Sequence, residues 1–306
     1  VLDWMVKNYR KLEQMPFDDP QLPVKTEAFR AQLYDIILNT KLSDEFQGRL
    51  RVALKETFGE EGPPGLFVRS DTNVEDLAGF TGAGLNLTLP NVVGFDNLLQ
   101  AITRVWASPF TARAFAWRQF HMSLPEHVYT SILLLESVAS DKSGVLVTQD
   151  IDTGDRGLIS VAVNEGLGGA VDGQAADSLR IALDDSSVRV LATATDPWRR
   201  VPNPKGGLLL LPSSGSDNVL HFTEIEQLAD FSRNLSDTFP PIVDDEGKAV
   251  PADVEFGFYD GKLRLFQLRP FLDSKAARGI EYLHHMEARL KDAGTIRVDM
   301  NGIPEA

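Results

Sequence analysis

A short apolar run in the stretch 66–84 ends in Arg69, and a polar turn with three glycines follows: Gly79, Gly82 and Gly84. A guanidinium presents five donors in a planar fork that suits phosphate oxygens. Glycines let backbone N–H groups approach an anion closely. The stretch therefore predicts a phosphate site. Two alternatives stay open, a surface ion pair for Arg69 and a plain hairpin turn for the glycines, because the spacing of neither common nucleotide-binding glycine motif occurs.

A second stretch, residues 252–270, alternates acidic and apolar side chains, so that Asp253 and Glu255 share one face of a strand. Its partner strand carries Gln267 and Arg269. A carboxylate beside an amide oxygen is a set of hard ligands suited to Mg²⁺. An ordinary amphipathic hairpin with solvated acids remains the alternative. A glycosidase-like pair of catalytic carboxylates is disfavoured, because two carboxylates on the same face of one strand cannot lie on either side of the bond to be cleaved.

The metal hypothesis depends on the register of this hairpin. Glu255 and Gln267 must project from one face, and a two-residue turn would point Gln267 into the core. A three-residue loop, residues 259–261, pairs Asp253 with Gln267 and keeps the polar residues together. We therefore predict that loop, with positive φ at Gly261.

The elements that position these residues follow from hydrophobic periodicity. Before residue 122, apolar residues recur at the spacing of helices. After residue 128, the apolar runs are typical of strands joined by short polar loops. We expect Ser43, Asp96 and Ser108 to cap helices, and a Thr223–Glu226 capping box to open another. Expected helices cover an N-terminal segment that prolines break from residue 16, then 26–38, 44–58, 96–106, 108–117, 223–239 and 274–291. Expected strands cover 66–68, 86–89, 128–136, 144–149, 158–163, 179–183, 188–194, 208–211 and the hairpin 253–269.

Composition narrows the function classes. The 306 residues carry a formal charge of −14, which argues against a nucleic-acid binder but not against a local nucleotide site. The absence of cysteine excludes disulfides and thiolate chemistry. No apolar run is long enough to span a membrane, and no signal peptide is recognisable. We expect a cytoplasmic protein, and the initial Val hints at a piece of a longer chain.

These two stretches, with residues 107–114, resemble the ATP-binding domain of the dikinases: phosphoenolpyruvate synthase, pyruvate phosphate dikinase and glucan water dikinase. The resemblance implies an α+β, ATP-grasp-like fold, with a helical N-terminal part, a largely antiparallel sheet region and a closing hairpin. We predict a helical segment over 1–64, a nucleotide-binding domain over 65–272, and a C-terminal helix and tail over 273–306.

The resemblance also implies roles for individual residues. ATP and Mg²⁺ are the expected cofactors. Leu135 stands where the family usually has Gln, and Gly169 where it has Glu. The catalytic residues would be Arg69 and Arg269; the ATP-binding residues Arg69, Thr81, Gly82, Gly84, Glu136, Ser137, Val138 and Asp253; and the metal ligands Glu255 and Gln267.

Parts of the dikinase apparatus are missing from this sequence. There is no Gly-Gly-Lys segment, no Thr-His carrier motif and no pyruvate-binding domain. The resemblance therefore implies a domain that binds Mg-ATP and passes a phosphoryl group to a carrier histidine outside this chain. Its partners would be that carrier domain and a small acceptor such as pyruvate. The alternatives are a non-catalytic relic that serves as a binding module, and the ATP domain of an antibiotic phosphotransferase.

Overall fold

The structure is a computed structural model, and it describes residues 1–73, 76–77, 80–81, 87–122, 127–170, 173–244 and 246–271. Contacts divide the chain at Pro270, and the first unit, Val1–Pro270, is described below. The expected helix over 274–291 lies outside the described residues. Within the described part, no helix is both long and apolar enough to cross a membrane. The predicted division into three segments stays a prediction.

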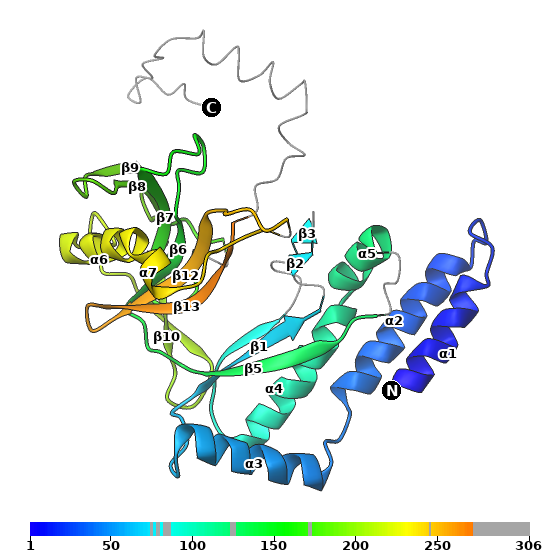
Figure 1. Cartoon of the computed structure of the whole chain (residues 1–306). Helices are drawn as coiled ribbons and strands as arrows, with labels where there is room; N and C mark the ends of the chain where they lie inside the picture. Colours follow the sequence, from blue (N-terminus) through cyan, green and yellow to red (C-terminus); the bar gives the residue numbers. More distant parts are fainter. Residues whose placement is uncertain are drawn as a thin grey trace, which may run out of the picture. The chain divides into compact units, whose positions relative to one another are not determined.

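Helices form the N-terminal part (Figure 1). The Ser43 cap is confirmed, because its Oγ accepts the N–H of Phe46 at 3.2 Å. The Asp96 cap is wrong, since Gly94 precedes that helix. Ser108 instead begins a 3-10 turn, and Thr111 precedes the helix that follows. The elements are α1 (Leu2–Glu13), α2 (Leu22–Leu38), α3 (Asp44–Phe58), α4 (Phe95–Ala107), η1 (Ser108–Phe110) and α5 (Ala112–His121).

The first sheet has three antiparallel strands in the order β4-β1-β5: β4 (Thr88–Val92), β1 (Leu66–Thr72) and β5 (Thr130–Glu136). Strand β1 alternates strictly in burial, as one covered face requires. Val68 is fully buried and belongs to one apolar cluster with Leu98 and Val105 of α4. Arg69 therefore projects from the face opposite α4.

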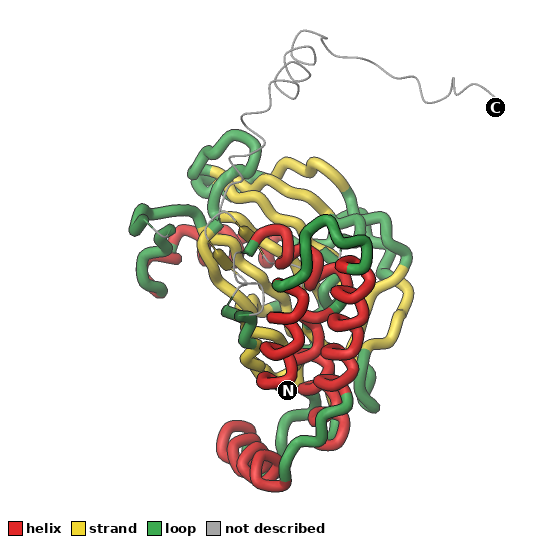
Figure 2. Tube along the Cα trace, turned by 90° about the vertical axis from the view of Figure 1, so that its right-hand side faces the viewer, coloured by secondary structure: helices red, strands yellow, loops and turns green. Residues whose placement is uncertain are grey.

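The second sheet has six antiparallel strands in the order β13-β12-β6-β7-β8-β9 (Figure 1). Figure 2 distinguishes the strands, in yellow, from the helices, in red. Val254, Phe256 and Phe258 are almost fully buried in one cluster with Leu228 of α6. The opposite face carries Asp253 and Glu255. The strands are β6 (Lys142–Val147), β7 (Leu158–Glu165), β8 (Asp177–Ala182), β9 (Val188–Ala192), β12 (Ala252–Tyr259) and β13 (Lys262–Pro270), with α6 (Phe222–Arg233) and α7 (Leu235–Thr238).

Two short strand pairs complete the described part: β2 (Asp76–Leu77) with β3 (Phe80–Thr81), and β10 (Trp198–Pro202) with β11 (Leu208–Pro212). Strand β10 is absent from the sequence prediction, because its two arginines interrupt the apolar pattern. The capping box is displaced by two residues: Glu224 accepts the N–H of His221 at 2.8 Å. Its helix also ends at Arg233, before the predicted residue 239. The α+β prediction with antiparallel sheets is confirmed.

Candidate nucleotide site

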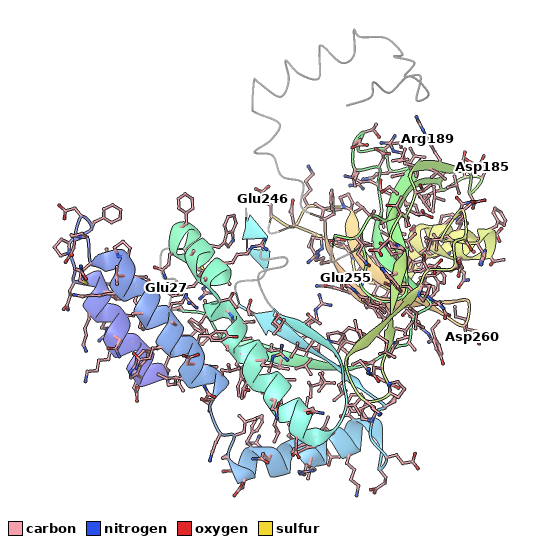
Figure 3. All side chains as sticks on the ribbon, turned by 180° about the vertical axis from the view of Figure 1, so that it is seen from behind. Glu27, Asp185, Arg189, Glu246, Glu255 and Asp260 are labelled. Atoms are coloured by element: carbon pink, nitrogen blue, oxygen red, sulfur yellow. The ribbon has the colours of Figure 1, made fainter. Side chains whose placement is uncertain are left out.

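The closing hairpin reaches the predicted side-chain arrangement by a different route. Tyr259 pairs with Lys262, so the turn has two residues, and the predicted three-residue loop is wrong. Asp260 and Gly261 both have positive φ, 51° and 67°, as a type I′ turn requires. Positive φ at Gly261 is thus confirmed, and Asp260 lies at the hairpin tip (Figure 3).

A β-bulge restores the register that the turn alone would lose. Phe256 pairs with Leu265, but Glu255 pairs with Gln267, which leaves Phe266 as an extra residue in β13. Glu255 and Gln267 are therefore directly opposed and project from the same face. The Phe266 ring lies beside Gly257, where a Cβ would approach it to 2.8 Å. Glycine at 257 gives the bulge its room.

Arg69 of the first sheet meets this pair on the second sheet. Its Nη1 donates to Glu255 Oε2 at 3.2 Å, and its Nη2 donates to the Oε1 of Gln267. The Arg69 and Glu255 side chains are only 20% and 18% exposed, so water screens their attraction incompletely. The residues predicted to bind phosphate and metal thus converge from strands far apart in the sequence.

Arg269 and Asp253 form a second pair beside the first. Arg269 Nε donates to Asp253 Oδ2 at 2.8 Å, and the two residues are opposed in the hairpin. Asp253 lies two residues from Glu255 on the same face of β12. The arrangement therefore presents two cationic forks and two carboxylates on one polar surface, the composition that a metal-bound polyphosphate requires.

The three residues predicted to contact adenine lie at the end of β5. Glu136 is exposed, and it is the last residue of this edge strand. The N–H of Ser137 donates to the carbonyl of Gly65 at 2.9 Å, so this donor is already used. The carbonyl of Val138 accepts the N–H of Ser140 at 2.8 Å. Among the described strands, β5 lies at the edge of its sheet. The roles of Glu136, Ser137 and Val138 toward adenine stay predictions.

Other predicted residues are outside the description or have structural roles. Gly82 and Gly84 lie outside the described residues, as does the side chain of Thr81. In the loop after β7, Ser143 Oγ donates to Gly166 O at 2.7 Å and accepts from Gly168 N–H at 2.8 Å. These bonds hold the glycine-rich segment 166–169 as a loop at the end of β7.

Two small apolar residues beside the site were missed. Val145 pairs with Glu255, and Ala162 pairs with Val145, so all three project from the same face of the second sheet. Both are partly exposed, whereas Val161 and Val163 on the other face are buried. The alternation in β7 was a signal for two faces, but periodicity alone does not say which face meets a ligand.

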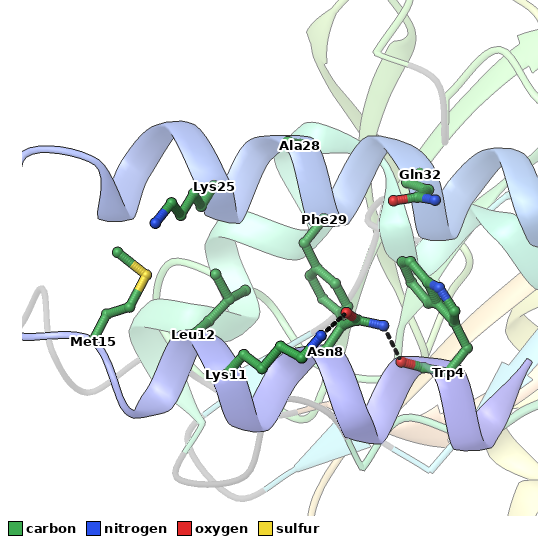
Figure 4. A pocket seen from close by; sticks show the side chains of 9 residues that line it. All are labelled: Trp4, Asn8, Lys11, Leu12, Met15, Lys25, Ala28, Phe29 and Gln32. Carbon is green, nitrogen blue, oxygen red and sulfur yellow. Dashed lines mark hydrogen bonds between the residues drawn. The ribbon is translucent and has the colours of Figure 1, made fainter.

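A cavity lies elsewhere, between α1 and α2 (Figure 4). It has a volume of about 380 Å³. Trp4 and Phe29 stack at 5.6 Å, and the polar side chains at its rim include Asn8 and Lys11. This cavity shares no residue with the predicted site, so the site's position rests on its chemistry.

An α+β domain with an arginine fork on one sheet and hard oxygen ligands on a second sheet has the features of an ATP-grasp-like nucleotide-binding domain. The sequence pattern of the pyruvate phosphate dikinase AMP/ATP-binding domain matches residues 6–287. The match covers most of the chain, and the chain belongs to that family.

The similar proteins are much longer than this chain. The phosphoenolpyruvate synthase of Pyrococcus furiosus is 27% identical over 308 residues, which cover 95% of this chain and 36% of that protein. The rifampicin phosphotransferase of Bacillus cereus is 30% identical over 216 residues, 70% of this chain and 24% of that protein. The probable phosphoenolpyruvate synthase of Archaeoglobus fulgidus is 28% identical over 269 residues, which cover 86% of this chain and 34% of that protein. The chain therefore spans roughly a third or less of the length of these relatives.

Proposed function

We propose that this chain binds Mg-ATP between the β4-β1-β5 sheet and the β12–β13 hairpin. The observation that carries the proposal is the convergence of Arg69 on Glu255 and Gln267. Arg69 and Arg269 would neutralise phosphate charge, and the free edge of β5 would offer backbone groups to the base. The Val145 and Ala162 surface is small and apolar enough to pack against a flat ring.

The residues present fit a magnesium ion. Glu255 and Gln267 supply a carboxylate and an amide oxygen from opposed positions, and Mg²⁺ is usually held by one or two such ligands together with phosphate oxygens and water. No group of three acidic or histidine ligands occurs among the described residues, which is compatible with a metal shared with the nucleotide. A bound Mg²⁺ would offset the charge of the phosphates.

We further propose that the phosphoryl group passes to a carrier histidine outside this chain. Phosphoryl transfer depends on positioning and charge neutralisation, and this site supplies both. The five histidines of the sequence do not supply a carrier, because none follows a threonine. The acceptor, such as pyruvate, would then react with the carrier and not with this domain.

A titration of this chain tests the binding step. We expect calorimetry to detect Mg-ATP, with weak affinity because the Gly-Gly-Lys segment is absent, and weaker binding still without magnesium. Submicromolar affinity that ignores magnesium would contradict the proposed site. Adding a phosphoenolpyruvate synthase carrier domain with Mg-ATP and following label from [γ-³²P]- and [β-³²P]ATP tests the transfer step.

A second candidate is the ATP domain of an antibiotic phosphotransferase. The 30% identity to the Bacillus cereus rifampicin phosphotransferase favours it. Both candidates need the same ATP site and differ only in the acceptor. Testing rifampicin and pyruvate as acceptors in the parent protein separates them.

A further inference from the structure

The β10–β11 hairpin contacts both sheets and belongs to neither. In the middle of β10, Arg200 forms a parallel bridge with Gly166, which directly follows β7 of the second sheet. The N–H of Leu167 donates to the carbonyl of Arg200 at 2.9 Å. A Cβ at Gly166 would lie 2.3 Å from that carbonyl oxygen, so this close contact requires glycine.

At its tip, the same hairpin is bonded to Asn91 of β4 in the first sheet. Asn91 Nδ2 donates to the carbonyls of Asn203 and Gly207, both at 2.7 Å. The N–H of Gly207 returns a bond to the carbonyl of Asn91 at 2.8 Å. Asn91 is 4% exposed and has φ +50°, a conformation that asparagine tolerates better than most residues. Its Oδ1 occupies the space that a Cβ at Gly65 would need.

The hairpin therefore spans the two sheets whose polar faces carry Arg69 and Glu255. Among the described residues, Arg69 joins those faces through bonds between side chains, whereas the hairpin contributes backbone groups to its bonds with Leu167 and with Asn91. Backbone contacts hold a position more tightly than long side chains, which lose more rotamer entropy when fixed.

We propose that the β10–β11 hairpin is a strap that sets the separation of the two sheets, and that Asn91 is its anchor. This inference rests on the proposed function. Asn91 would be a positioning residue: it does not reach the nucleotide, but it holds the phosphate fork and the metal ligands at the spacing that binding needs. If the two sheets were held more loosely, binding would also have to order them, and the affinity for Mg-ATP would be lower.

The first test is Asn91→Ala, with Mg-ATP affinity measured by calorimetry. Losing the two side-chain bonds should weaken binding about tenfold while the protein still unfolds cooperatively. Asn39→Ala is the matched control, because the Asn39 amide also donates to one carbonyl, at 2.8 Å, but within its own helix. If a folded Asn91→Ala variant bound Mg-ATP as tightly as wild type, the role of Asn91 as the anchor would be refuted.

A disulfide rescue separates positioning from general damage. A Cβ built at Gly206 lies 3.6 Å from Val93 Cβ, within the range for a disulfide, and the chain has no other cysteine. In the triple variant Asn91→Ala, Val93→Cys, Gly206→Cys, oxidation should restore most of the lost affinity. Strain at Gly206, whose φ is +103°, is common to the oxidised and reduced forms and cancels in the comparison. Identical affinities in the two forms would refute the strap.

A measurement without nucleotide tests the strap independently of the proposed Mg-ATP binding. Spin labels at Gln100→Cys in α4 and Glu226→Cys in α6 lie on helices that pack against the first and second sheets respectively. The strap predicts a broader distance distribution in Asn91→Ala than in wild type or Asn39→Ala. Broadening supports the strap even if wild type fails to bind Mg-ATP, which would refute only the proposed function. An unchanged distribution refutes the strap.

Discussion

At the scale of single residues, Arg69 and a metal ion would compete for the same two oxygens. Arg69 now donates to both Glu255 and Gln267. A cation that binds those oxygens must displace the guanidinium, and the displaced fork is then available for phosphate. Arg69 would thus link metal binding to nucleotide binding.

This competition predicts opposite effects of Arg69→Ala on two ligands. Mn²⁺, used as a spectroscopic substitute for Mg²⁺, should bind about tenfold more tightly without nucleotide, because the guanidinium of Arg69 no longer competes with the metal for the oxygens of Glu255 and Gln267. ATP should bind at least about tenfold more weakly, because a charge-assisted contact is lost. Paramagnetic resonance of free Mn²⁺ and calorimetry measure the two effects. Arg189→Ala, an exposed arginine on β9, is the control, and unchanged Mn²⁺ affinity in Arg69→Ala would contradict the competition.

Asp150 illustrates a buried charge with a structural role. Burial by itself raises the pKa of this carboxyl, but bonds from the N–H groups of Thr153 and Asp152, at 2.8 and 2.9 Å, and the charge of Arg180 lower the pKa overall. Asp150 is fully buried and also forms an ion pair with Arg180. It stabilises the turn between β6 and β7.

A depressed carboxyl pKa adds stability above the unfolded-state value, near 3.8, and that stability is lost as pH falls through the folded-state value. We expect Asp150→Asn to lower the free energy of unfolding by about 2–3 kcal/mol at pH 7, since Arg180 loses a buried partner. The difference from wild type should shrink below about pH 4. Urea unfolding between pH 3 and 7 measures it, and a difference independent of pH would exclude the charge as the cause.

At the scale of elements, the hairpin β12–β13 combines two devices. The two-residue turn satisfies the local preference of Asp260-Gly261, and the bulge at Phe266 then returns Gln267 to the face of Glu255. Neither device alone would place Glu255 and Gln267, the two predicted metal ligands, on one face. The candidate site therefore depends on an extra residue, Phe266, that is not itself one of the predicted ligands.

Gly257→Ala tests this dependence. The new Cβ would lie 2.6 Å from Ser140 Oγ and 2.8 Å from the Phe266 ring, so the bulge must shift. We expect a loss of about 1–3 kcal/mol in the free energy of unfolding and weaker Mg-ATP binding by the folded variant. Gly48→Ala in α3 is the control: nothing lies within 4 Å of its added Cβ, and alanine should stabilise the helix by up to about 1 kcal/mol. If Gly257→Ala bound Mg-ATP with wild-type affinity, the candidate site would not depend on the bulge.

At the scale of the whole described unit, three apolar clusters support different parts of it. One lies between α1, α2 and α5, one between α4 and the first sheet, and one between α6 and the second sheet. Only the latter two carry strands with site residues. The helices α1 and α2 would therefore affect stability more than binding, whereas α3 packs against the cluster of the first sheet. Limited proteolysis tests the proposed boundaries at 64 and 272.

Leu33→Ala tests whether stability and binding are separable. Leu33 is fully buried in the α1–α2–α5 cluster, so the free energy of unfolding should fall by about 2–5 kcal/mol. Mg-ATP affinity of the folded fraction should stay unchanged, because none of the site residues belongs to that cluster. Leu191→Ala, a leucine that is 48% exposed, should have little effect on either quantity. A Leu33→Ala variant that folds but loses affinity would show that the helices shape the site.

The sequence by itself determined the local features of this protein. The alternation in residues 253–258 and the cap at Ser43 follow from periodicities and propensities that act within a few residues. The strand predicted over 66–68 was too short: β1 continues to Thr72, so Arg69 lies within it and not at its end. The sequence motifs also indicated the family, which the match over residues 6–287 confirmed. These features need no knowledge of where distant segments meet.

Only the tertiary structure decided how the site is assembled. Arg69 is 186 residues from Glu255 and 198 from Gln267, and no periodicity relates positions so far apart. The bulge at Phe266 arises because the two faces of β12 must satisfy the core and the polar surface together, which a turn preference alone cannot express. Likewise, the bonds of Asn91 to the β10–β11 hairpin exist because folding places β4 beside the tip of that hairpin.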